Sequence, residues 1–226
     1  MCGRYSITTP VEALQQAFGF PERPNLAPRY NLAPTQEAPV VRREADGKHL
    51  AMLRWGLVPF WAKDVSIGAR MINARCESLA EKPAFRDAFR KRRCLVLADG
   101  FYEWTSEGGK KLPWRIGRTD GKPFAFAGLY ERWHAEQPDK LETFTIVTTE
   151  ANRRLKAIHD RMPVVLSAEA ASAWLDPASA APDLHDLLRP CPDDWLTAVR
   201  VSARINSVRN DDAACAAPLA TTGNLL

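Results

Sequence analysis

The sequence predicts an α+β fold in which one compact domain has a mainly antiparallel, barrel-like β core with peripheral helices. Its 226 residues suit one domain of ordinary size, and a hydrophobic content of 46% is enough for a substantial core. About eight short strand patterns are separated by turns, with only a few helical patterns between them. Strands and helices alternate too irregularly for a doubly wound parallel sheet, and a nearly closed antiparallel sheet would bury the many Val, Ile, Leu and Phe residues.

The first elements in chain order are a short strand and a capped helix. Residues 1–7 have the pattern of a strand, and Thr9-Pro10-Val11-Glu12 has the pattern of a capping box with proline at the first helical position. We expect this helix to run through Phe18 and to stop at Gly19. Residues 21–39 carry five prolines, which predicts an extended loop.

Apolar runs and turn signals place the remaining elements. The expected strands are 40–43, 49–58, 71–77, 94–98, 101–104, 114–116, 124–129, 142–148, 164–166 and 198–205. Asp120-Gly121 is expected to join two of these strands in a hairpin. The expected helices are 84–92, 152–159 (ending near Pro163), 167–175 with a Ser167 cap, and 183–188. The alanine-rich tail from Ala213 is expected to be disordered.

Composition limits the classes of function. The net charge of +4 is uneven: residues 1–118 hold 20 Lys+Arg and 12 Asp+Glu, whereas residues 119–226 hold 11 and 15. A basic half suits a polyanion partner, although an ordinary solvated surface is an equal alternative. No stretch approaches the ~18 apolar residues of a membrane span, and Arg4 with the polar run 6–10 interrupts any signal peptide. The five cysteines are odd in number and widely spaced without CxxC, which argues against disulfides and zinc and favours a reducing cytoplasm.

Cys2 follows the initiator methionine directly. Once Met1 is removed, the α-amine and the thiol of one residue form a 1,2-aminothiol, which condenses with an aldehyde to an imine and then closes a thiazolidine ring. A terminal amine titrates near ~7.7–8.0 and a free thiol near ~8.5, so both groups approach their nucleophilic forms at neutral pH. The alternative is that Cys2 is a small apolar residue at the start of a strand.

A polar strip and a flanked carboxylate are further candidates. At strand spacing, Asn73, Arg75 and Glu77 project from one face, where they can bind a polar ligand such as a phosphate. Glu103 lies in Asp99-Gly100-Phe101-Tyr102-Glu103-Trp104, and the aromatic neighbours would desolvate it and raise its pKa. The structural alternatives are a cross-strand ion pair for the strip and an exposed edge-strand carboxylate for Glu103.

A histidine and several tryptophans complete the candidates. His159 shares the expected helical face with Leu155, so a core histidine is the default, but a helix C-terminus would favour its imidazolium form as a proton donor. Of seven tryptophans, Trp55, Trp61 and Trp104 fall beside glycine, proline or polar motifs. Exposed aromatic side chains beside arginines can stack on unpaired bases, whereas core packing is the usual role of a tryptophan.

Six sequence blocks in order carry a family resemblance. They are Met1-Cys2-Gly3-Arg4-Tyr5, Tyr30-Asn31-Leu32-Ala33-Pro34, Trp55-Gly56-Leu57-Val58-Pro59, Ile72-Asn73-Ala74-Arg75-Cys76-Glu77, Ala98-Asp99-Gly100-Phe101-Tyr102-Glu103-Trp104 and Ile158-His159-Asp160-Arg161-Met162-Pro163. With Val201-Ser202 and Asn206-Ser207-Val208-Arg209-Asn210, they resemble the SOS response-associated peptidase (SRAP) family. Segments 131–142 and 176–195 match poorly. The resemblance implies an SRAP domain at 1–212 and a tail at 213–226.

The resemblance implies an abasic site processing protein of the DNA-damage (SOS) response. Such proteins form a thiazolidine between the N-terminal cysteine and the ring-opened aldehyde of an abasic site in single-stranded DNA, which protects the site from lyase-type strand cleavage. The family resemblance also implies a positively charged cleft and neither a metal nor an organic cofactor. We expect a monomer in the cytoplasm, associated with the nucleoid when bound to DNA and independent of membranes. Met1 is removed either autocatalytically, as the name peptidase suggests, or by methionine aminopeptidase.

Residue roles follow from the matching motifs. The resemblance implies that Cys2 is the nucleophile, that Asn73 orients the amine or the opened sugar, that Glu103 shuttles protons and that His159 protonates the sugar oxygen. The implied DNA contacts are Arg4, Arg75 and Arg161 at phosphates, with Trp55, Trp61 and Trp104 as stacking or wedge residues. Two other functions stay open: an N-terminal-nucleophile cysteine peptidase acting on proteins, and a non-covalent reader of modified or single-stranded DNA.

Overall fold

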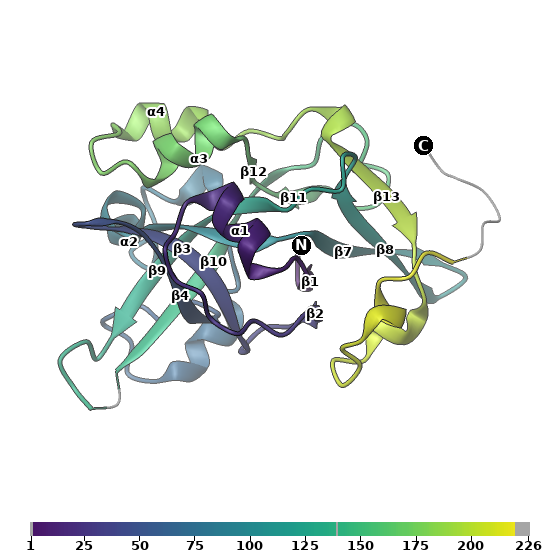
Figure 1. Cartoon of the computed structure of the whole chain (residues 1–226), viewed down its shortest axis with the longest axis horizontal. Coiled ribbons are helices and arrows are strands. Elements are labelled where there is room, and N and C mark those ends of the chain that lie inside the picture. Colours follow the sequence, from purple (N-terminus) through teal and green to yellow (C-terminus); the bar gives the residue numbers. More distant parts are fainter. Residues whose placement is uncertain (1, 139, 220–226) are drawn as a thin grey trace.

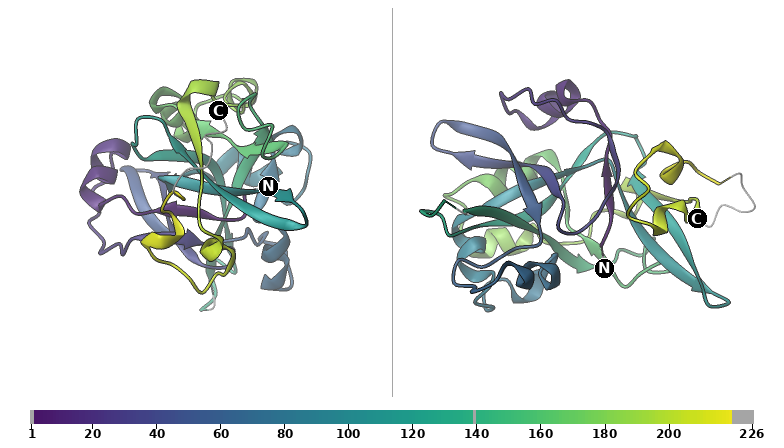
Figure 2. Two further views of the ribbon diagram at one scale, coloured as in Figure 1. Left: turned by 90° about the vertical axis from the view of Figure 1, so that its right-hand side faces the viewer. Right: turned by 90° about the horizontal axis from the view of Figure 1, so that it is seen from below.

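The core of the computed structural model, which describes residues 2–138 and 140–219, is a closed ring of strands (Figures 1 and 2). In order around the ring these are β3 (Glu37–Glu44), β4 (Gly47–Trp55), β10 (Leu141–Glu150), β9 (Phe124–Trp133) and β6 (Arg93–Ala98). The ring closes because β10 pairs with both β4 and β9. Only the β4–β10 pairing within the ring is parallel. The prediction of a mainly antiparallel, barrel-like core is therefore confirmed.

Short strands extend the ring and a second sheet adjoins it. The additions to the ring are β5 (Asn73–Arg75) and β11 (Arg161–Pro163) on β10, and β12 (Val165–Leu166) on β9. The second sheet has the order β13 (Leu196–Arg200), β8 (Lys110–Arg118), β7 (Gly100–Glu107), β1 (Tyr5–Ile7), β2 (Arg29–Leu32). Only Asp99 separates β6 from β7, so the chain passes directly from the ring into the second sheet.

Helices surround this β core. The α-helices are α1 (Val11–Phe18), α2 (Arg86–Lys91), α3 (Ala168–Leu175) and α4 (Ala181–Asp186). Short 3-10 helices occupy Val65–Arg70, Cys76–Ser78, Asp193–Trp195, Ala203–Asn206 and Ala213–Cys215. Figure 1 shows α3 and α4 on one side of the ring and the C-terminal segment beside β8 and β13. No helix among the described residues is long and apolar enough to cross a membrane.

Aromatic side chains fill the core and fix the start of the chain. Tyr5 is fully buried, and its ring meets the ring of Trp55 edge-on with centroids 5.1 Å apart. It also meets Phe126 edge-on at 6.0 Å, while Trp55 stacks on Phe144 at 6.3 Å. Because edge-to-face and offset contacts of this kind add to the stabilisation from burial, β1 is held firmly against the ring. Cys2, three residues before Tyr5, is thereby placed inside the molecule.

The first helix forms as expected, but its predicted cap does not. It ends at Gly19, which has the left-handed φ of 73° that glycine adopts readily. The Thr9 hydroxyl contacts Asp99 Oδ2 at 3.1 Å instead of capping the helix. Asp99 also accepts hydrogen bonds from Ser6 and Thr8, so a charged acceptor distant in sequence takes the donors that a local cap would use.

Three other local predictions are wrong. Asp120-Gly121 does not join a hairpin, because β8 pairs with β7 and β13 whereas β9 belongs to the ring. Residues 153–158 form turns rather than a helix, and Asn152 Oδ1 accepts the Leu155 N–H at 3.0 Å. The proline-rich segment 21–39 includes β2 and the start of β3, so it is only partly a loop.

The prediction of a disordered tail from Ala213 is wrong for residues 213–219. Ala213–Cys215 is a 3-10 helix, and Cys215 is fully buried against the Tyr102 side of the second sheet. The Leu219 N–H donates to the Arg200 carbonyl at 2.9 Å. The rest of the predicted tail, 220–226, lies outside the described residues.

Candidate active site

Cys2 lies buried at the end of β10 where two short strands converge. β5 pairs with β10 through Asn73↔Ile146, and the Asn73 Nδ2 group donates to the Cys2 carbonyl at 2.9 Å. The other amide atom, Asn73 Oδ1, is buried and has no hydrogen-bond partner among the described residues. Burial, with the charge of nearby Glu103, raises the pKa of the Cys2 thiol well above its usual range. The thiol therefore needs a neighbouring base before it can attack as a thiolate.

Glu103 supplies a buried carboxyl next to Cys2. It lies on β7, an internal strand between β1 and β8, and is only 5% exposed, so the alternative of an exposed edge-strand residue is wrong. Burial raises the pKa of Glu103 to about 7, the charge of the amino terminus opposes this effect, and the negative charge of Asp160 adds to it. A carboxyl that titrates near neutral pH can both accept and donate a proton under physiological conditions.

His159 reaches the same end of β10 from the other edge. The segment that follows it, β11, pairs with Thr148 to Glu150 of β10. The Nδ1 atom of His159 lies 2.9 Å from the Arg161 backbone nitrogen and 2.9 Å from Asp160 Oδ1. An Nδ1 atom that accepts the Arg161 N–H carries no proton, so the neutral ring then has its proton on Nε2. An Nδ1–H, in the other neutral tautomer or in the protonated ring, would instead donate to Asp160 Oδ1.

The ionisation state of His159 differs from the sequence prediction. Burial, together with the amino-terminal charge, lowers the pKa of His159 below its ordinary value of 6.5. No helix ends at this residue, so the dipole that was to favour the imidazolium form is absent. His159 is therefore harder to protonate than an ordinary histidine, and acceptance of the Arg161 N–H by Nδ1 leaves Nε2–H as the donor of the neutral ring.

Two of the three arginines expected at DNA phosphates are instead used within the protein. Arg161 makes a bidentate pair with Glu77, at 2.5 and 3.0 Å, and donates to the Thr148 carbonyl at 2.7 Å. This pairing lowers the pKa of Glu77 to about 2 and realises the cross-strand ion pair foreseen as the alternative. Arg4 donates to Asn31 Oδ1 and to a backbone carbonyl, both at 2.8 Å. Arg75 is exposed and forms no ion pair with any residue that the structure describes.

The three tryptophans have different environments. Trp55 is 1% exposed and its Nε1 donates to the Ile72 carbonyl at 2.8 Å, so its prediction as a DNA-stacking residue is wrong and it belongs to the core. Trp61 is 48% exposed beside Phe60, which is 54% exposed. Trp104 is half-buried, and its Nε1 donates to Asn206 Oδ1 at 2.7 Å. Trp61 is thus the candidate with a ring most open to solvent.

Asn31 is a structural residue of the site that sequence reasoning missed. It is fully buried, accepts from Arg4, and its Nδ2 lies 2.7–3.3 Å from the carbonyls of Ile205, Ser207 and Asn210. It thereby fastens the segment 205–210 over β1 and β2. The block Tyr30-Asn31-Leu32-Ala33-Pro34 contained the signal, but only the fold shows what the amide holds.

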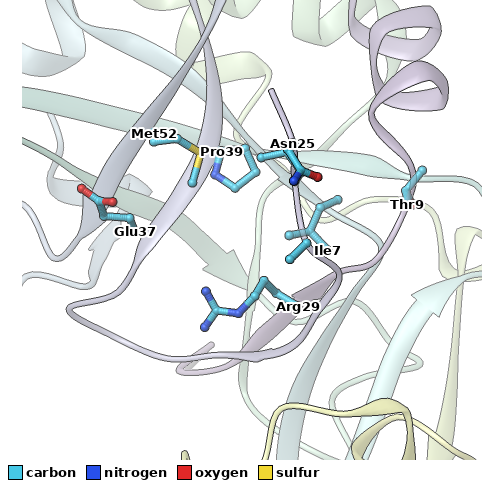
Figure 3. Close-up of a pocket in the computed structure, with 9 residues that line it drawn as sticks. Ile7, Thr9, Asn25, Arg29, Glu37, Pro39 and Met52 are labelled. Atoms are coloured by element: carbon cyan, nitrogen blue, oxygen red, sulfur yellow. The ribbon is translucent and has the colours of Figure 1, made fainter. Parts of the chain in front are cut away.

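A separate hollow of about 150 Å³ lies beside β1 (Figure 3). Its walls include Ile7, Pro39 and Met52, with Arg29 and Glu37 as charged residues. None of the four predicted catalytic residues lines it. The Arg29 guanidinium already contacts Gln36 and Asp211. This hollow therefore has no group of side chains comparable to the one around Cys2.

The five cysteines, all within the described residues, are free and buried. Among residues 2–138 and 140–219 there is no group of three or more His, Cys, Asp or Glu side chains that could hold a metal ion.

Comparisons with known proteins cover nearly the whole chain. Residues 1–208 match the family model described as SOS response associated peptidase (SRAP). The chain is 43% identical over 218 residues to abasic site processing protein YoaM of Bacillus subtilis, covering 94% of this chain and 96% of that protein. It is 30% identical over 264 residues to abasic site processing protein HMCES of Gallus gallus, covering 97% and 78%. A crystal structure of a protein from Bacteroides thetaiotaomicron has a TM-score of 0.87 at 27% identity, covering 96% and 100%.

Proposed function

The chain belongs to the SOS response-associated peptidase family, and we propose that it processes abasic sites by linking itself covalently to them. In this proposal Cys2, freed of Met1, captures the ring-opened aldehyde of an abasic site in single-stranded DNA as a thiazolidine. The observation that carries the proposal is the hydrogen bond from Asn73 to the Cys2 carbonyl beside a buried Glu103 that titrates near neutral pH. The abasic site processing names of the relatives supply the substrate class.

The first bond forms between the Cys2 nitrogen and the aldehyde carbon. The ionised Glu103 carboxylate carries the two protons of the amine, one after the other, to the oxygen of the addition product, which leaves as water and yields an imine. Asn73 holds the backbone of Cys2 during this step, and its unpartnered Oδ1 can accept an N–H of the new amino terminus. As the sugar ring opens, the His159 Nε2–H donates a hydrogen bond to the ring oxygen, and the proton that this oxygen takes up is the one that the anomeric hydroxyl loses.

The second bond closes the ring. The Cys2 sulfur adds to the imine carbon, and the thiol proton passes to the nitrogen, so aldehyde and aminothiol give thiazolidine and one water. Since burial raises the pKa of this thiol, proton removal has to accompany attack, and the Glu103 carboxylate is the neighbouring base. Ring closure consumes the imine from which β-elimination would break the strand, so capture protects the lesion.

Exposed basic and aromatic side chains support single-stranded DNA as the ligand. Arg75 is exposed on the strand that carries Asn73 and can contact a phosphate. Trp61 and Phe60 offer exposed rings for base stacking, and Trp104 borders the segment that Asn31 fastens. Arg4 and Arg161 support DNA binding indirectly, through the backbone that they position.

The test is intact mass and a denaturing gel after mixing the Met1-free protein with single-stranded DNA that carries an abasic site. We expect an adduct that survives denaturation, is lost in Cys2→Ala, and is absent when the aldehyde is first reduced. Cys76→Ala, which removes another buried cysteine, is the matched control and should retain the adduct. A chain that keeps Met1 or an N-terminal tag should form none.

Two results would replace this proposal. A complex that forms but dissociates fully on denaturation would support a non-covalent reader of damaged DNA. Peptide turnover that Cys2→Ala abolishes, without any DNA adduct, would support an N-terminal-nucleophile cysteine peptidase.

A further inference from the structure

A basic hollow of about 440 Å³ lies beside β3, α2 and β6, and none of the four predicted catalytic residues lines it. Its lining includes Arg43 from the end of β3, Arg90 and Lys91 from α2, and Arg93 from the start of β6. β6 runs from Arg93, on the lining of the hollow, to Ala98, and the chain then continues into β7, which carries Glu103. Figure 1 shows α2 and β7 on opposite sides of the ring.

Positive charge on the lining is not balanced locally. Arg43, Arg90 and Lys91 are exposed, and the described part of the chain gives them no ion-pair partner. The one carboxylate on the lining, Glu44, already pairs with Arg42 Nε at 2.6 Å. Like charges around a concave surface repel one another and together create a positive potential that attracts anions.

Arg93 is a rigid charge at the base of this hollow. It is only 7% exposed, and its guanidinium donates to the carbonyls of Trp174 and Asp176 at 2.6 Å and to those of Phe89 and Arg90 at 3.0 and 2.9 Å. These carbonyls belong to the ends of α2 and α3, so Arg93 joins the two helices. Carbonyl dipoles hold the guanidinium, and the exposed Asp176 carboxylate, which accepts from the Ala178 N–H, adds one nearby negative charge to the four positive charges of the lining.

We propose that this hollow binds a phosphate group, with Arg43, Arg90 and Lys91 contacting its oxygens and Arg93 supplying a fixed positive charge behind them. Guanidinium and ammonium groups make charge-assisted hydrogen bonds to phosphate oxygens, and several of them converging from different elements give a defined site. The phosphate belongs either to a small phosphorylated compound or to a DNA backbone that extends beyond the candidate site at Cys2. The simpler alternative is a solvated basic surface, in which Arg90 and Lys91 only stabilise the C-terminus of α2.

The test is a titration of the full-length protein with inorganic phosphate at constant ionic strength, followed by amide chemical shifts. We expect saturable shifts confined to the segments around Arg43, Arg93 and Asp176. The variant Arg43→Ala/Arg90→Ala/Lys91→Ala should bind phosphate at least about tenfold more weakly, which corresponds to about 1.4 kcal/mol.

The matched control is Lys110→Ala/Lys111→Ala/Lys122→Ala, which removes three other exposed positive charges. This control should bind phosphate as the unmodified protein does. Shifts that do not saturate, or an equal loss in both triple variants, would show a solvated basic surface and overturn the proposal.

A second titration with undamaged single-stranded DNA identifies the source of the phosphate. If DNA shifts the same amides, and the triple variant lowers the slope of log affinity against log salt by about 2, the ligand is the DNA backbone, since each single-strand phosphate contact contributes about 0.7. If only inorganic phosphate shifts them, the ligand is a small phosphorylated compound. Neither readout involves Cys2, so the outcome is independent of adduct formation.

Discussion

Replacing Glu103 by glutamine should stabilise the folded protein at alkaline pH while impairing its chemistry. Glutamine has nearly the shape of glutamate but carries no charge at any pH. Glu103 is 5% exposed, and burial raises its pKa from an ordinary value of 4.5 to about 7. The wild-type protein therefore has to ionise a buried carboxyl above neutral pH, and the variant does not.

The size and sign of the effect follow from the two pKa values. Between pH 4.5 and about 7 the folded state holds a proton on Glu103 that the unfolded state has lost, so the free energy of unfolding falls as the pH rises through this window. At about 1.36 kcal/mol per pH unit, a window of about 2.5 units gives a loss of about 3 kcal/mol. The free energy of unfolding of Glu103→Gln should thus equal that of the wild type near pH 4.5 and exceed it by about 3 kcal/mol at pH 8.

Urea denaturation of both Met1-free proteins at acid and alkaline pH measures this difference. Glu107→Gln, the same substitution at an exposed position of β7, is the matched control and should show no such pH-dependent gain. In parallel, Glu103→Gln should slow adduct formation by about 10²–10⁴-fold, the usual contribution of a general acid–base group. A stability difference that is the same at both pH values would refute the assignment of a buried, raised-pKa carboxyl.

Three further predictions concern Asn73, the two tryptophans Trp55 and Trp61, and His159. Asn73→Ala should lower the free energy of unfolding by about 1–3 kcal/mol, because it leaves the Cys2 carbonyl without its hydrogen-bond donor. The same variant should form the adduct more slowly. Unchanged adduct kinetics would contradict a positioning role for Asn73. Trp55→Ala should lower the free energy of unfolding, measured with urea, by about 3–5 kcal/mol, because Trp55 is buried. Trp61→Ala should leave the free energy of unfolding almost unchanged and weaken single-stranded DNA binding by about 1–3 kcal/mol, because Trp61 is exposed. The reverse pattern would contradict the burial assigned to the two residues. The ring of His159 should titrate below pH 6.5 and carry its neutral-form proton on Nε2 by nitrogen NMR, and a midpoint above 6.5 would contradict the burial argument.

Local sequence patterns predicted most of the strands and the helix ends. Strands at 40–43 and 49–58 were expected from their apolar runs, and the structure pairs β3 with β4 from Glu37↔Arg54 to Glu44↔Gly47. The end of α1 was equally local, since Gly19 adopts a positive φ more readily than other residues. The failures involved partners distant in sequence. Asp120-Gly121 marks a turn correctly but does not show that β8 and β9 leave it for different sheets.

Local sequence patterns also did not predict which strands close the ring. It depends on a parallel pairing of β4 with β10, which joins Arg54 to Thr143 and Trp55 to Phe144. No turn signal specifies such a pairing, because the two strands are far apart in the chain and their register is set by packing in the core.

By itself, the sequence determined the reactive group and the motif residues of the candidate site: the aminothiol chemistry of Cys2 needs only its place behind Met1, and Asn73, Glu103 and His159 came from the resemblance of their blocks. Tertiary structure alone decided which side chains are available. It placed Trp55 in the core and paired Arg161 with Glu77, 84 positions away. The reason is physical: covalent chemistry and turn preference belong to a residue and its neighbours, whereas burial, charge pairing and the resulting pKa depend on groups that only folding brings together.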